Sequence, residues 1–461
     1  MWIWAALAAT PALAAAADVP KGGPATASGK EALDILKRSV AFRTVAGEGQ
    51  VPSYAAFLKE RLVAAGSKPD EVRFTPVGET GYLTARYPGR DRAAKPIVLL
   101  AHMDVVPARR EDWARDPFTP VVENGYIYGR GALDNKADLS VVAATLAKLR
   151  RSGWTPARDV VLALSGDEET QMATTQRLAE ELRGAELVLN ADAGGGLLGE
   201  DGKPIVFRLQ AGEKTYADYT LTVTDPGGHS SRPGPNNAIY RLAAGLGRLA
   251  AYRFPAQASP LTRAYMRASA PRTPGPAGAA MRAFAANPKD ARAADVLSAD
   301  PEYIGLVRTT CVATMITGGH APNALPQEAK ATVNCRIFPG VGMAETQAEL
   351  ARVLADPAIK VASVDSGTLA APESPLRPDV LRAVTNAVHA RAPGLPIVPS
   401  MESGATDSMH FRARGVPAYG VSSVFLKPSD DFAHGLNERL PLATLDAGVR
   451  QWEALLRGIA G

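Results

Sequence analysis

The chain has 461 residues, of which 46% are hydrophobic, and its 51 basic and 47 acidic side chains leave a formal net charge of +4. This length is typical of two or three domains with large hydrophobic cores. The positive charges are not gathered into basic blocks, which argues against nucleic acid as a partner. No run of 18 apolar residues follows the N-terminal segment, so we expect no membrane-spanning helix in the mature protein.

The N-terminal segment resembles a secretory signal peptide. Residues 1–17 carry no charged side chain, contain an apolar run and include the small-residue pattern Ala12-Leu13-Ala14. Cleavage between Ala14 and Ala17 would send the protein to a periplasm or outside the cell. Basic residues are missing before the apolar run, so a membrane tether or a disordered tail stays an alternative. Residues 18–29 are rich in Pro, Gly and Ala, and we expect them to form a linker.

The first large segment, residues 30–212, follows the pattern of an α/β domain. Short apolar runs indicate buried strands, and apolar residues spaced three or four apart indicate helices. Helices are expected at 30–39, 54–65 and 138–150, and strands at 82–87, 97–100, 160–165 and 187–190. Strands that alternate with helices in this way predict a mostly parallel sheet.

The second segment, residues 213–370, differs in character. It contains an alternating strand at 216–224, a helix at 236–252, a hairpin of 311–317 with 329–337, a helix at 343–354 and a strand at 359–364. These elements predict an antiparallel sheet with helices on one face. We expect residues 255–305 to form a partly helical insertion. The α/β pattern returns in residues 371–461, so the smaller α+β unit is predicted to be inserted into the larger domain.

The chain has two cysteines, Cys311 and Cys335, on opposite arms of the expected hairpin. Antiparallel pairing would place them roughly opposite each other, so a disulfide could form in an oxidising compartment. Two buried free thiols are an equally good interpretation. Neither cysteine lies among the other candidate ligands, which argues against a thiolate metal site.

Ligand-type side chains follow several of the expected buried strands. His102 and Asp104 come directly after strand 97–100, and an acidic run, Asp167-Glu168-Glu169, comes after strand 160–165. The other members of the set are Asp134, Asp192 and His434. Each one alone has an ordinary structural explanation, such as a helix N-cap. Together they would be costly to bury without partners.

A mixed set of imidazoles and carboxylates suits zinc, with cobalt or manganese as alternatives. The five candidate metal ligands are His102, Asp134, Glu169, Asp192 and His434. Five ligands are too many for one catalytic zinc that keeps an open position, but they are enough for two ions if one carboxylate bridges them.

These residues carry a family resemblance that runs from about residue 30 to the end of the chain. The sequence resembles the di-zinc exopeptidases and deacylases that include glutamate carboxypeptidase, aminoacylase, succinyl-diaminopimelate desuccinylase and acetylornithine deacetylase. The matching motifs, in the family's order, are His102-Met103-Asp104, Gly129-Arg130-Gly131 with Asp134 and Lys136, Asp167-Glu168-Glu169, and Asn190-Ala191-Asp192. The sequence around Trp113 and Asp116-Pro117-Phe118 is most similar to the carboxypeptidase S-like branch, which also contains hydrolases of N-acyl amino acids.

The resemblance implies a role for each residue of the set. His102 and Asp192 would bind one zinc ion, Glu169 and His434 the other, and Asp134 would bridge them. Glu168 would be the general base, and the carboxylate of Asp104 would orient His102. The fold implied is a zinc-exopeptidase catalytic domain with an inserted lid or dimerisation domain.

Four further residues match the family's substrate contacts. His229, in Gly227-Gly228-His229-Ser230-Ser231, would stabilise the oxyanion of the tetrahedral intermediate, often in the active site of a partner subunit. Asn323 and Arg336 would contact the substrate carboxylate when the lid closes, and Gly404 would lie near the substrate. Structural alternatives are a turn histidine for His229 and a surface strand residue for Arg336. A homodimer through the lid domain follows from the same resemblance.

These residues predict an exported di-zinc hydrolase that cleaves an amide bond next to a free carboxylate, as a carboxypeptidase or dipeptidase. The first alternative is an N-acyl-amino-acid deacylase on the same scaffold. Two rivals belong to other classes: a metal-binding regulatory relative without catalysis, and a di-metal phosphoesterase. Glu168 and the complete ligand set argue against the first rival, and Arg336 with the order of the motifs argues against the second.

Overall fold

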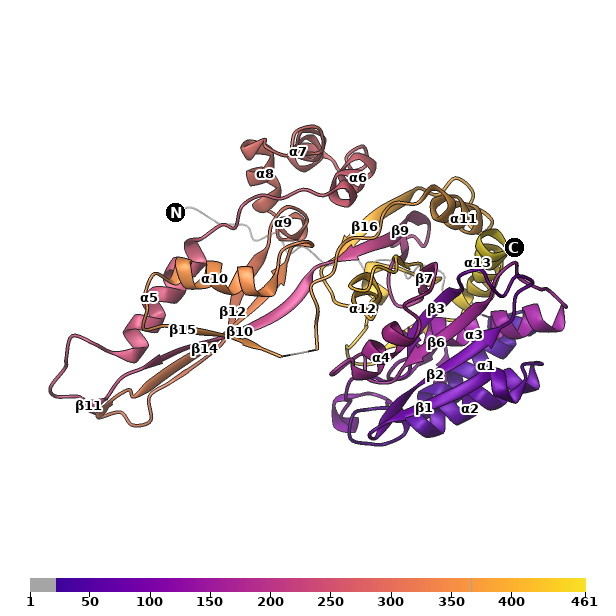
Figure 1. The fold of residues 1–461 in the computed structure, drawn as a ribbon, viewed down its shortest axis with the longest axis horizontal. Helices are drawn as coiled ribbons and strands as arrows, with labels where there is room; N and C mark the ends of the chain where they lie inside the picture. The colour runs from indigo at the N-terminus through magenta and orange to yellow at the C-terminus, as the bar shows by residue number, and fades with distance from the viewer. Residues whose placement is uncertain (1–21, 366) are drawn as a thin grey trace, which may run out of the picture.

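The computed structural model describes residues 22–365 and 367–461, so the expected signal peptide lies outside the described residues. A larger body is built on one sheet, and a long arm projects from it (Figure 1). The strands of the larger sheet are β1 (Val72–Val77), β2 (Thr80–Tyr87), β3 (Ile97–His102), β6 (Val160–Ser165), β7 (Leu187–Asn190), β8 (Gly195–Leu198), β9 (Pro204–Glu213), β16 (Ile397–Glu402), β17 (Ala418–Gly420) and β18 (Phe425–Leu426).

The centre of this sheet is parallel, as the sequence predicts. The strand order is β1-β2-β6-β3-β7-β17-β9-β8-β18, with β16 beside β9. Strands β6, β3, β7 and β17 run parallel, whereas β1 and β2 form an antiparallel edge. Because β3 ends beside β6 and β7, the side chains that follow these three strands meet at one edge of the sheet.

Helices cover both faces of this sheet. On one face lie α1 (Ala27–Ala41), α2 (Val51–Ala64), α3 (Lys136–Arg151), α11 (Pro378–His389) and α13 (Ala443–Ala460), and on the other lie α4 (Ala173–Glu181) and α12 (Ser408–Arg412). Ile97 and Leu99 of β3 pack with the first group, and Val98 and Leu100 with the second. A strand buried on both faces must be apolar throughout, which is why β3 lacks alternation. Helix α1 begins inside the expected linker 18–29.

The arm contains a second, antiparallel sheet with helices on one face, as predicted. Its strand order is β12-β14-β10-β15, formed by β12 (Thr310–Gly318), β14 (Glu328–Ile337), β10 (Thr215–Thr224) and β15 (Lys360–Val364). Helices α5 (Ala238–Ala251) and α10 (Met343–Leu354) pack on it through a core that includes Tyr219 and Leu242. A small pair, β11 (Gly228–His229) and β13 (Ala324–Leu325), lies at the tip of the arm (Figure 1). We call this unit the lid.

The expected insertion at 255–305 is more regular than the sequence suggested. It forms four helices, α6 (Pro260–Ser269), α7 (Gly275–Ala286), α8 (Ala291–Ser298) and α9 (Pro301–Val307). They share a core of their own that includes Met266, Met281, Phe284 and Leu297. Helix α6 also packs on β16, so the insertion contacts the larger body beside the strand that leads into the lid.

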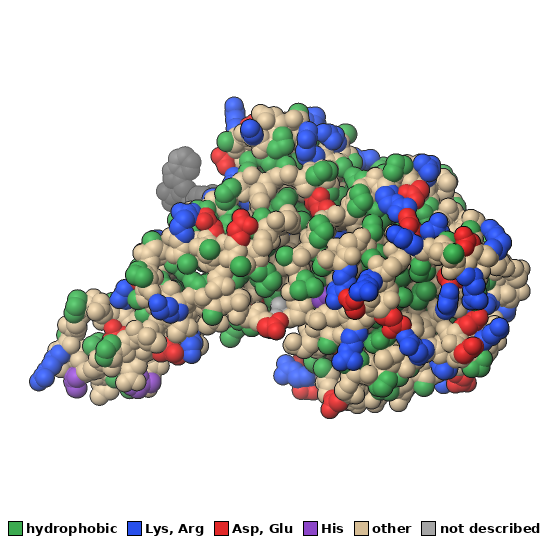
Figure 2. All heavy atoms as spheres, in the orientation of Figure 1, with side chains coloured by type: hydrophobic (Ala, Val, Ile, Leu, Met, Phe, Trp, Pro, Cys, Tyr) green, Lys and Arg blue, Asp and Glu red, His purple; other side chains and the backbone are tan. Residues whose placement is uncertain are grey.

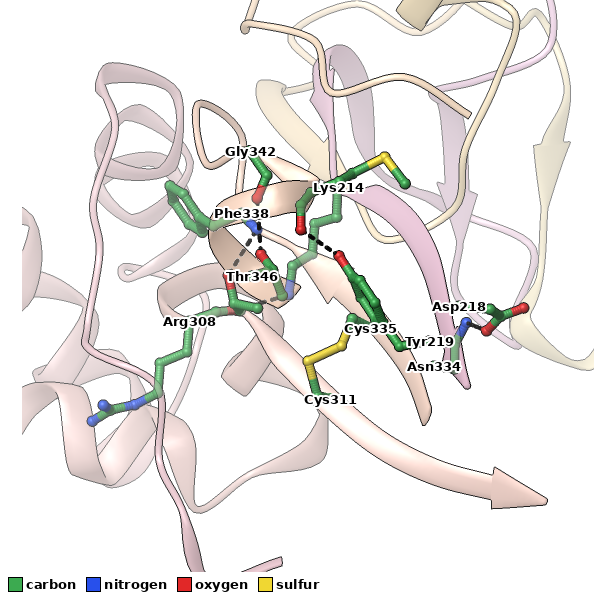
Figure 3. Close-up of a disulfide and its surroundings, with 12 residues drawn as sticks. Lys214, Asp218, Tyr219, Arg308, Cys311, Asn334, Cys335, Phe338, Gly342 and Thr346 are labelled. Atoms are coloured by element: carbon green, nitrogen blue, oxygen red, sulfur yellow. Dashed lines mark hydrogen bonds between the residues drawn. A yellow bond between two sulfur atoms is a disulfide. The ribbon is translucent and has the colours of Figure 1, made fainter. Parts of the chain in front are cut away.

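Cys311 and Cys335 form a disulfide between β12 and β14, where the two residues are direct cross-strand partners (Figure 3). The interpretation as free thiols is therefore wrong. The bond ties the outer strand of the lid sheet to its neighbour.

The remaining elements lie in the loops of the larger body. A three-stranded sheet joins β4 (Val121–Glu123), β5 (Tyr126–Tyr128) and β19 (Arg439–Pro441), and short 3-10 turns occur at Pro69–Glu71, Arg110–Asp112 and Pro428–Asp430. Among the helices that the structure describes, none has the length and apolar character needed to cross a bilayer.

Candidate metal centre

The centre begins at the carboxyl end of β3, where His102 is held by its own neighbour. The Nδ1 atom of His102 lies 3.0 Å from the main-chain oxygen of Asp104, so Nε2 faces the centre. The carboxylate of Asp104 is 3.6 Å from Nδ1 and instead accepts the main-chain N–H groups of Glu168 and Glu169, at 3.1 and 3.0 Å. The resemblance implied that this carboxylate orients His102. In the structure the carbonyl of Asp104 is the nearer partner of Nδ1, and the carboxylate, which lies next to the same atom, also fixes the turn that carries the two glutamates.

Asp134 lies between the two histidines. Its Oδ1 atom is 2.9 Å from Nε2 of His102, and its Oδ2 atom is 3.2 Å from Nε2 of His434. The loop of residues 129–135 delivers Asp134 just before α3, whereas His434 comes from the loop between β18 and β19. A carboxylate with one oxygen toward each imidazole is placed as a bridging ligand would be.

The two adjacent glutamates have different surroundings. Oε1 of Glu169 lies 2.9 Å from Nε2 of His434. Glu168 is buried beside His102 and Asp192, yet within the described part of the chain its carboxylate has no hydrogen-bond partner. Oδ1 of Asp192 is 3.5 Å from Nε2 of His102. Ligand-type atoms of His102, Glu168 and Asp192 lie within 4.8 Å of one another, as do those of His102, Asp134 and Glu169.

Negative charge is in excess at this site. Burial raises the pKa of Asp192 to about 7 and also raises the pKa values of Glu168 and Glu169. Hydrogen bonds to Asp134 and Glu169 raise the pKa of His434 to about 10. Crowded buried carboxylates ionise together only when a cation compensates them. The donor set therefore fits divalent cations bound between the two histidines.

Sequence reasoning missed Glu438, which holds the loop of Asp134. Glu438 is fully buried, pairs with Arg130 at 2.6 Å and accepts the main-chain N–H groups of Leu133 and Asp134 at 2.7 and 3.0 Å. It also accepts the N–H of Gly131 at 3.1 Å. Nothing in the local sequence distinguishes this acidic residue from an exposed one, because its partners lie about 300 positions earlier.

Asp407 was missed as well, although its neighbour Gly404 was singled out. The buried carboxylate of Asp407 accepts hydrogen bonds from the hydroxyls of Ser165 and Thr175, and burial raises its pKa to about 7. It joins the end of β6 to α4 and α12. At the end of β7, the side-chain oxygen of Asn190 accepts the main-chain N–H of Asp192 at 2.9 Å and so holds the turn that carries the Asp192 carboxylate.

The structure separates the predicted lid residues into two groups. Arg336 on β14 donates a hydrogen bond to the carbonyl of Ser403 at 2.8 Å, which places it beside Gly404 at the base of the lid. His229 and Asn323 lie together at the tip, where the N–H of Ser230 donates to the carbonyl of Asn323 at 3.0 Å.

The tip and the base of the lid are far apart. Arg336 lies near one end of β14, and the eight residues from there to Glu328 span about 27 Å of strand. The space-filling view shows that the tip stands clear of the larger body (Figure 2). Within one chain, Asn323 and Arg336 therefore do not share a substrate carboxylate, contrary to expectation, and His229 is remote from the metal centre.

A cavity of about 360 Å³ opens beside Asp134 and Asp192. Its lining includes apolar side chains such as Leu133, Leu197 and Leu426, and the basic residues Arg208 and Lys427. Sequence reasoning did not identify the cavity, because only part of its wall comes from the segments of Asp134 and Asp192, and the rest comes from β8, β9, β16 and the residues around β18.

Comparisons with known proteins agree with this geometry. The sequence profile of peptidase family M20/M25/M40 matches residues 98–458. The chain is 32% identical over 283 residues to the N-fatty-acyl-amino acid synthase/hydrolase PM20D1 of Mus musculus, a match that covers 59% of this chain and 55% of that protein. The chain thus spans about half the length of this curated relative.

Solved structures show the same fold. The M20 family metallo-carboxypeptidase Sso-CP2 from Sulfolobus solfataricus superposes with a TM-score of 0.71 at 18% identity, covering 93% of this chain and 99% of that one. The YXEP protein of Bacillus subtilis, described as a dinuclear metal binding peptidase, superposes with a TM-score of 0.58 at 13% identity, covering 93% and 97%. Because the family profile covers most of the chain, this protein belongs to peptidase family M20/M25/M40.

Proposed function

We propose that this protein is a metal-dependent amidohydrolase that cleaves an amide bond next to a free carboxylate, as a carboxypeptidase or dipeptidase. One observation carries the proposal. Asp134 directs one carboxylate oxygen to His102 and the other to His434, while the carboxylate of Glu168, close to His102, accepts no hydrogen bond from any residue that the structure describes. Membership of a metallopeptidase family and the fold shared with a metallo-carboxypeptidase support the same activity.

Two zinc ions fit the residues present. His102 and Asp192 would hold one ion, Glu169 and His434 would hold the other, and Asp134 would contact both. Cobalt and manganese suit the same donors. When bound, such ions lower the pKa of water and polarise the carbonyl that is attacked.

The chain itself supplies the proton transfers. Glu168 would accept a proton from the attacking water and return it to the leaving nitrogen, so that an amide and water become a carboxylic acid and an amine. Arg336, with its planar set of N–H donors, would bind the free carboxylate of the substrate. Asp104 and Glu438 would keep the two carboxylate-bearing loops in place.

An N-acyl-amino-acid deacylase is the second candidate. It is favoured by the name of the mouse relative and by the partly apolar cavity beside Asp134, which could receive an acyl group. Both candidates use the same chemistry on an amide next to a carboxylate. They differ only in the group on the other side of the bond.

A paired substrate panel distinguishes these candidates. Dipeptides, N-acetyl amino acids and N-fatty-acyl amino acids would each be offered to the zinc-loaded enzyme, with and without chelator. Chelator-sensitive cleavage of dipeptides supports the peptidase, and preference for acyl amino acids supports the deacylase. No cleavage by protein with bound metal, or cleavage that Glu168→Gln leaves unchanged, overturns the proposal. A parallel set of phosphoesters tests the phosphoesterase rival.

We infer that the chain acts as a homodimer through the lid. Val312, Met315 and Ile316 are exposed apolar residues on β12, one of the two edge strands of the lid sheet. The remote position of His229 supports a role in the partner's site. Mixing His229→Ala with Glu168→Ala chains should restore about a quarter of wild-type activity, because half of the random dimers are mixed and each has one complete site. No recovery in proven mixed dimers overturns the trans role.

We also propose that the protein is exported. The Cys311–Cys335 disulfide and the signal-like N-terminus both support an oxidising compartment outside the cytoplasm. Fractionation of cells that express the full chain, and the same chain without residues 2–17, tests this. Retention of both forms in the cytoplasm contradicts it.

A further inference from the structure

A row of polar residues adjoins Arg336 on the open face of the lid sheet. In the register of β10 and β14, Tyr216 is the direct partner of Arg336, and Asp218 is the direct partner of Asn334. Direct partners in an antiparallel pair place their side chains on the same face of the sheet. Tyr219 and Cys335 belong to the core under α5 and α10, so this row lies on the opposite face.

The four side chains are linked by contacts that end at Arg336. The guanidinium carbon of Arg336 lies 4.6 Å from the centroid of the Tyr216 ring, in a cation–π contact. The Tyr216 hydroxyl donates a hydrogen bond to Asp218 at 2.6 Å. The side-chain amide of Asn334 donates to the other oxygen of Asp218 at 2.8 Å (Figure 3). The ring is therefore fixed at its hydroxyl end, and its face supports the guanidinium.

Arg336 is held in a way that leaves donors free. Within the described part of the chain it donates one hydrogen bond, to the carbonyl of Ser403 at 2.8 Å. A guanidinium carries five N–H donors, so most remain available to a ligand. Tyr216 fixes the plane of the group and Ser403 fixes one corner. A planar group held in this way can meet a carboxylate without first losing its own freedom.

We propose that Tyr216 is a positioning residue for the substrate carboxylate, because its ring, held by Asp218, fixes the plane of Arg336. This inference rests on the proposed function, which gives Arg336 the contact with the carboxylate. It assigns specificity for a planar anion to the Tyr216–Arg336 pair rather than to Arg336 alone. The effect is on binding of the acid and not on the chemical step at the metal centre.

The test separates binding from catalysis in zinc-loaded enzyme. KM and kcat are measured for the best free-acid substrate and for its C-terminal amide, with Tyr216→Leu, Tyr216→Phe and Arg336→Ala. Loss of the ring in Tyr216→Leu should raise KM for the acid roughly three- to thirtyfold. We expect kcat for both substrates to stay within about twofold of the wild-type value. The KM for the amide, which is already higher than that for the acid, should also change by less than about twofold. Tyr216→Phe keeps the ring, so its KM for the acid should stay close to the wild-type value.

The lid offers a matched control. Tyr252 stacks on Arg352, at 5.5 Å, and its hydroxyl is bonded to Glu349, so the same residue types meet elsewhere in the same domain. Tyr252→Leu removes a comparable contact without touching Arg336. It should leave KM for the acid unchanged, and a rise equal to that of Tyr216→Leu would show a general effect on the lid and overturn the inference.

The remaining outcomes separate the inference from the proposed function. If Arg336→Ala raises KM for the acid but Tyr216→Leu does not, the inference is wrong and the function stands. If Tyr216→Leu lowers kcat for acid and amide alike, its role is structural, and the inference is also wrong. If Arg336→Ala leaves KM for the acid unchanged, the assignment of the carboxylate to Arg336 fails, and the inference falls with it.

Discussion

The main-chain N–H of Asp134 donates a hydrogen bond to the carboxylate of Glu438, 3.0 Å away, although the two residues are 304 positions apart. The same carboxylate is paired with Arg130 at 2.6 Å. The residue that lies between the two histidines is therefore positioned by a segment close to the C-terminus. A fully buried acceptor with several charged and main-chain donors is rigid, which suits a ligand whose two oxygens must point in different directions.

Replacement of Glu438 should weaken both the fold and the metal centre. Glu438→Gln keeps the size of the side chain but leaves the buried charge of Arg130 uncompensated, which typically costs about 3–5 kcal/mol. We expect a lower unfolding temperature and fewer bound metal ions per chain. Glu328→Gln, which removes an exposed partner of Lys330, is the control. Equal stability and metal content in the two variants would contradict the role given to Glu438.

Substitution of each of the two adjacent glutamates should have a different effect, on catalysis for Glu168 and on metal binding for Glu169. Glu168→Gln removes the free carboxylate and should lower kcat by roughly 10²- to 10⁴-fold, the usual contribution of a general base, while bound metal is retained. Glu169→Gln removes the partner of His434 and should release metal. Metal analysis and kinetics on the same samples check both outcomes. Loss of metal from Glu168→Gln would instead make Glu168 a ligand.

Lys214 should make stability depend on pH. It is fully buried between β9 and β10, and its Nζ donates to the carbonyl of Arg308 at 2.7 Å (Figure 3). Burial, and then the charge of Arg336, lower its pKa to about 7. The unfolded chain, with a lysine pKa of about 10.4, binds more protons between these values, so stability rises with pH from about 7 to about 10.

The substitution Lys214→Met removes that dependence. The variant should be more stable than wild type at pH 7, after allowance for about 1 kcal/mol from the lost hydrogen bond, and the difference should shrink toward about pH 10. Thermal unfolding of both proteins across this range measures it. Lys330→Met on the exposed face of β14 is the control, for which we expect a constant difference. A constant difference for Lys214→Met would show that burial does not lower the pKa of Lys214.

The disulfide should stabilise the lid. It closes a loop with a sequence separation of 24, for which chain entropy gives about 3.5 kcal/mol. Cys311→Ala with Cys335→Ala should unfold at a lower temperature than wild type. Reductant should lower the wild-type value to that of the double variant and leave the double variant unchanged. If reductant has no effect on wild type and the two proteins unfold together, the bond does not stabilise the protein.

Much of the fold could be predicted from the sequence because the sequence patterns that indicate its strands and helices are local. The apolar runs of β3, β6 and β7 and the leucine spacing of α3 are short-range patterns with a direct physical cause. Strands such as β8 and β16 lie in glycine-rich or mixed segments, and they are strands because β9 pairs with them. Tertiary pairing, rather than local preference, decides such segments.

The site divides in the same way. His102 and Asp192 lie at or just after the ends of predicted strands, and Asp134 lies just before a predicted helix. The structure brings the three side chains together. Glu438 and Asp407, the buried carboxylates that hold the neighbouring loops in place, could not be predicted in this way. Their hydrogen-bond partners lie far away along the chain. The separation of Asn323 from Arg336 also follows from strand length, which a list of motifs in order does not contain.

The claim that one chain holds two metal ions is tested most directly by their number. Protein purified without chelator and reloaded with zinc would be analysed by mass spectrometry of the metals, beside Asp134→Asn. We expect two ions per wild-type chain, and loss of both in Asp134→Asn, because this carboxylate faces both histidines. One ion per wild-type chain, or two ions that persist in Asp134→Asn, would contradict it.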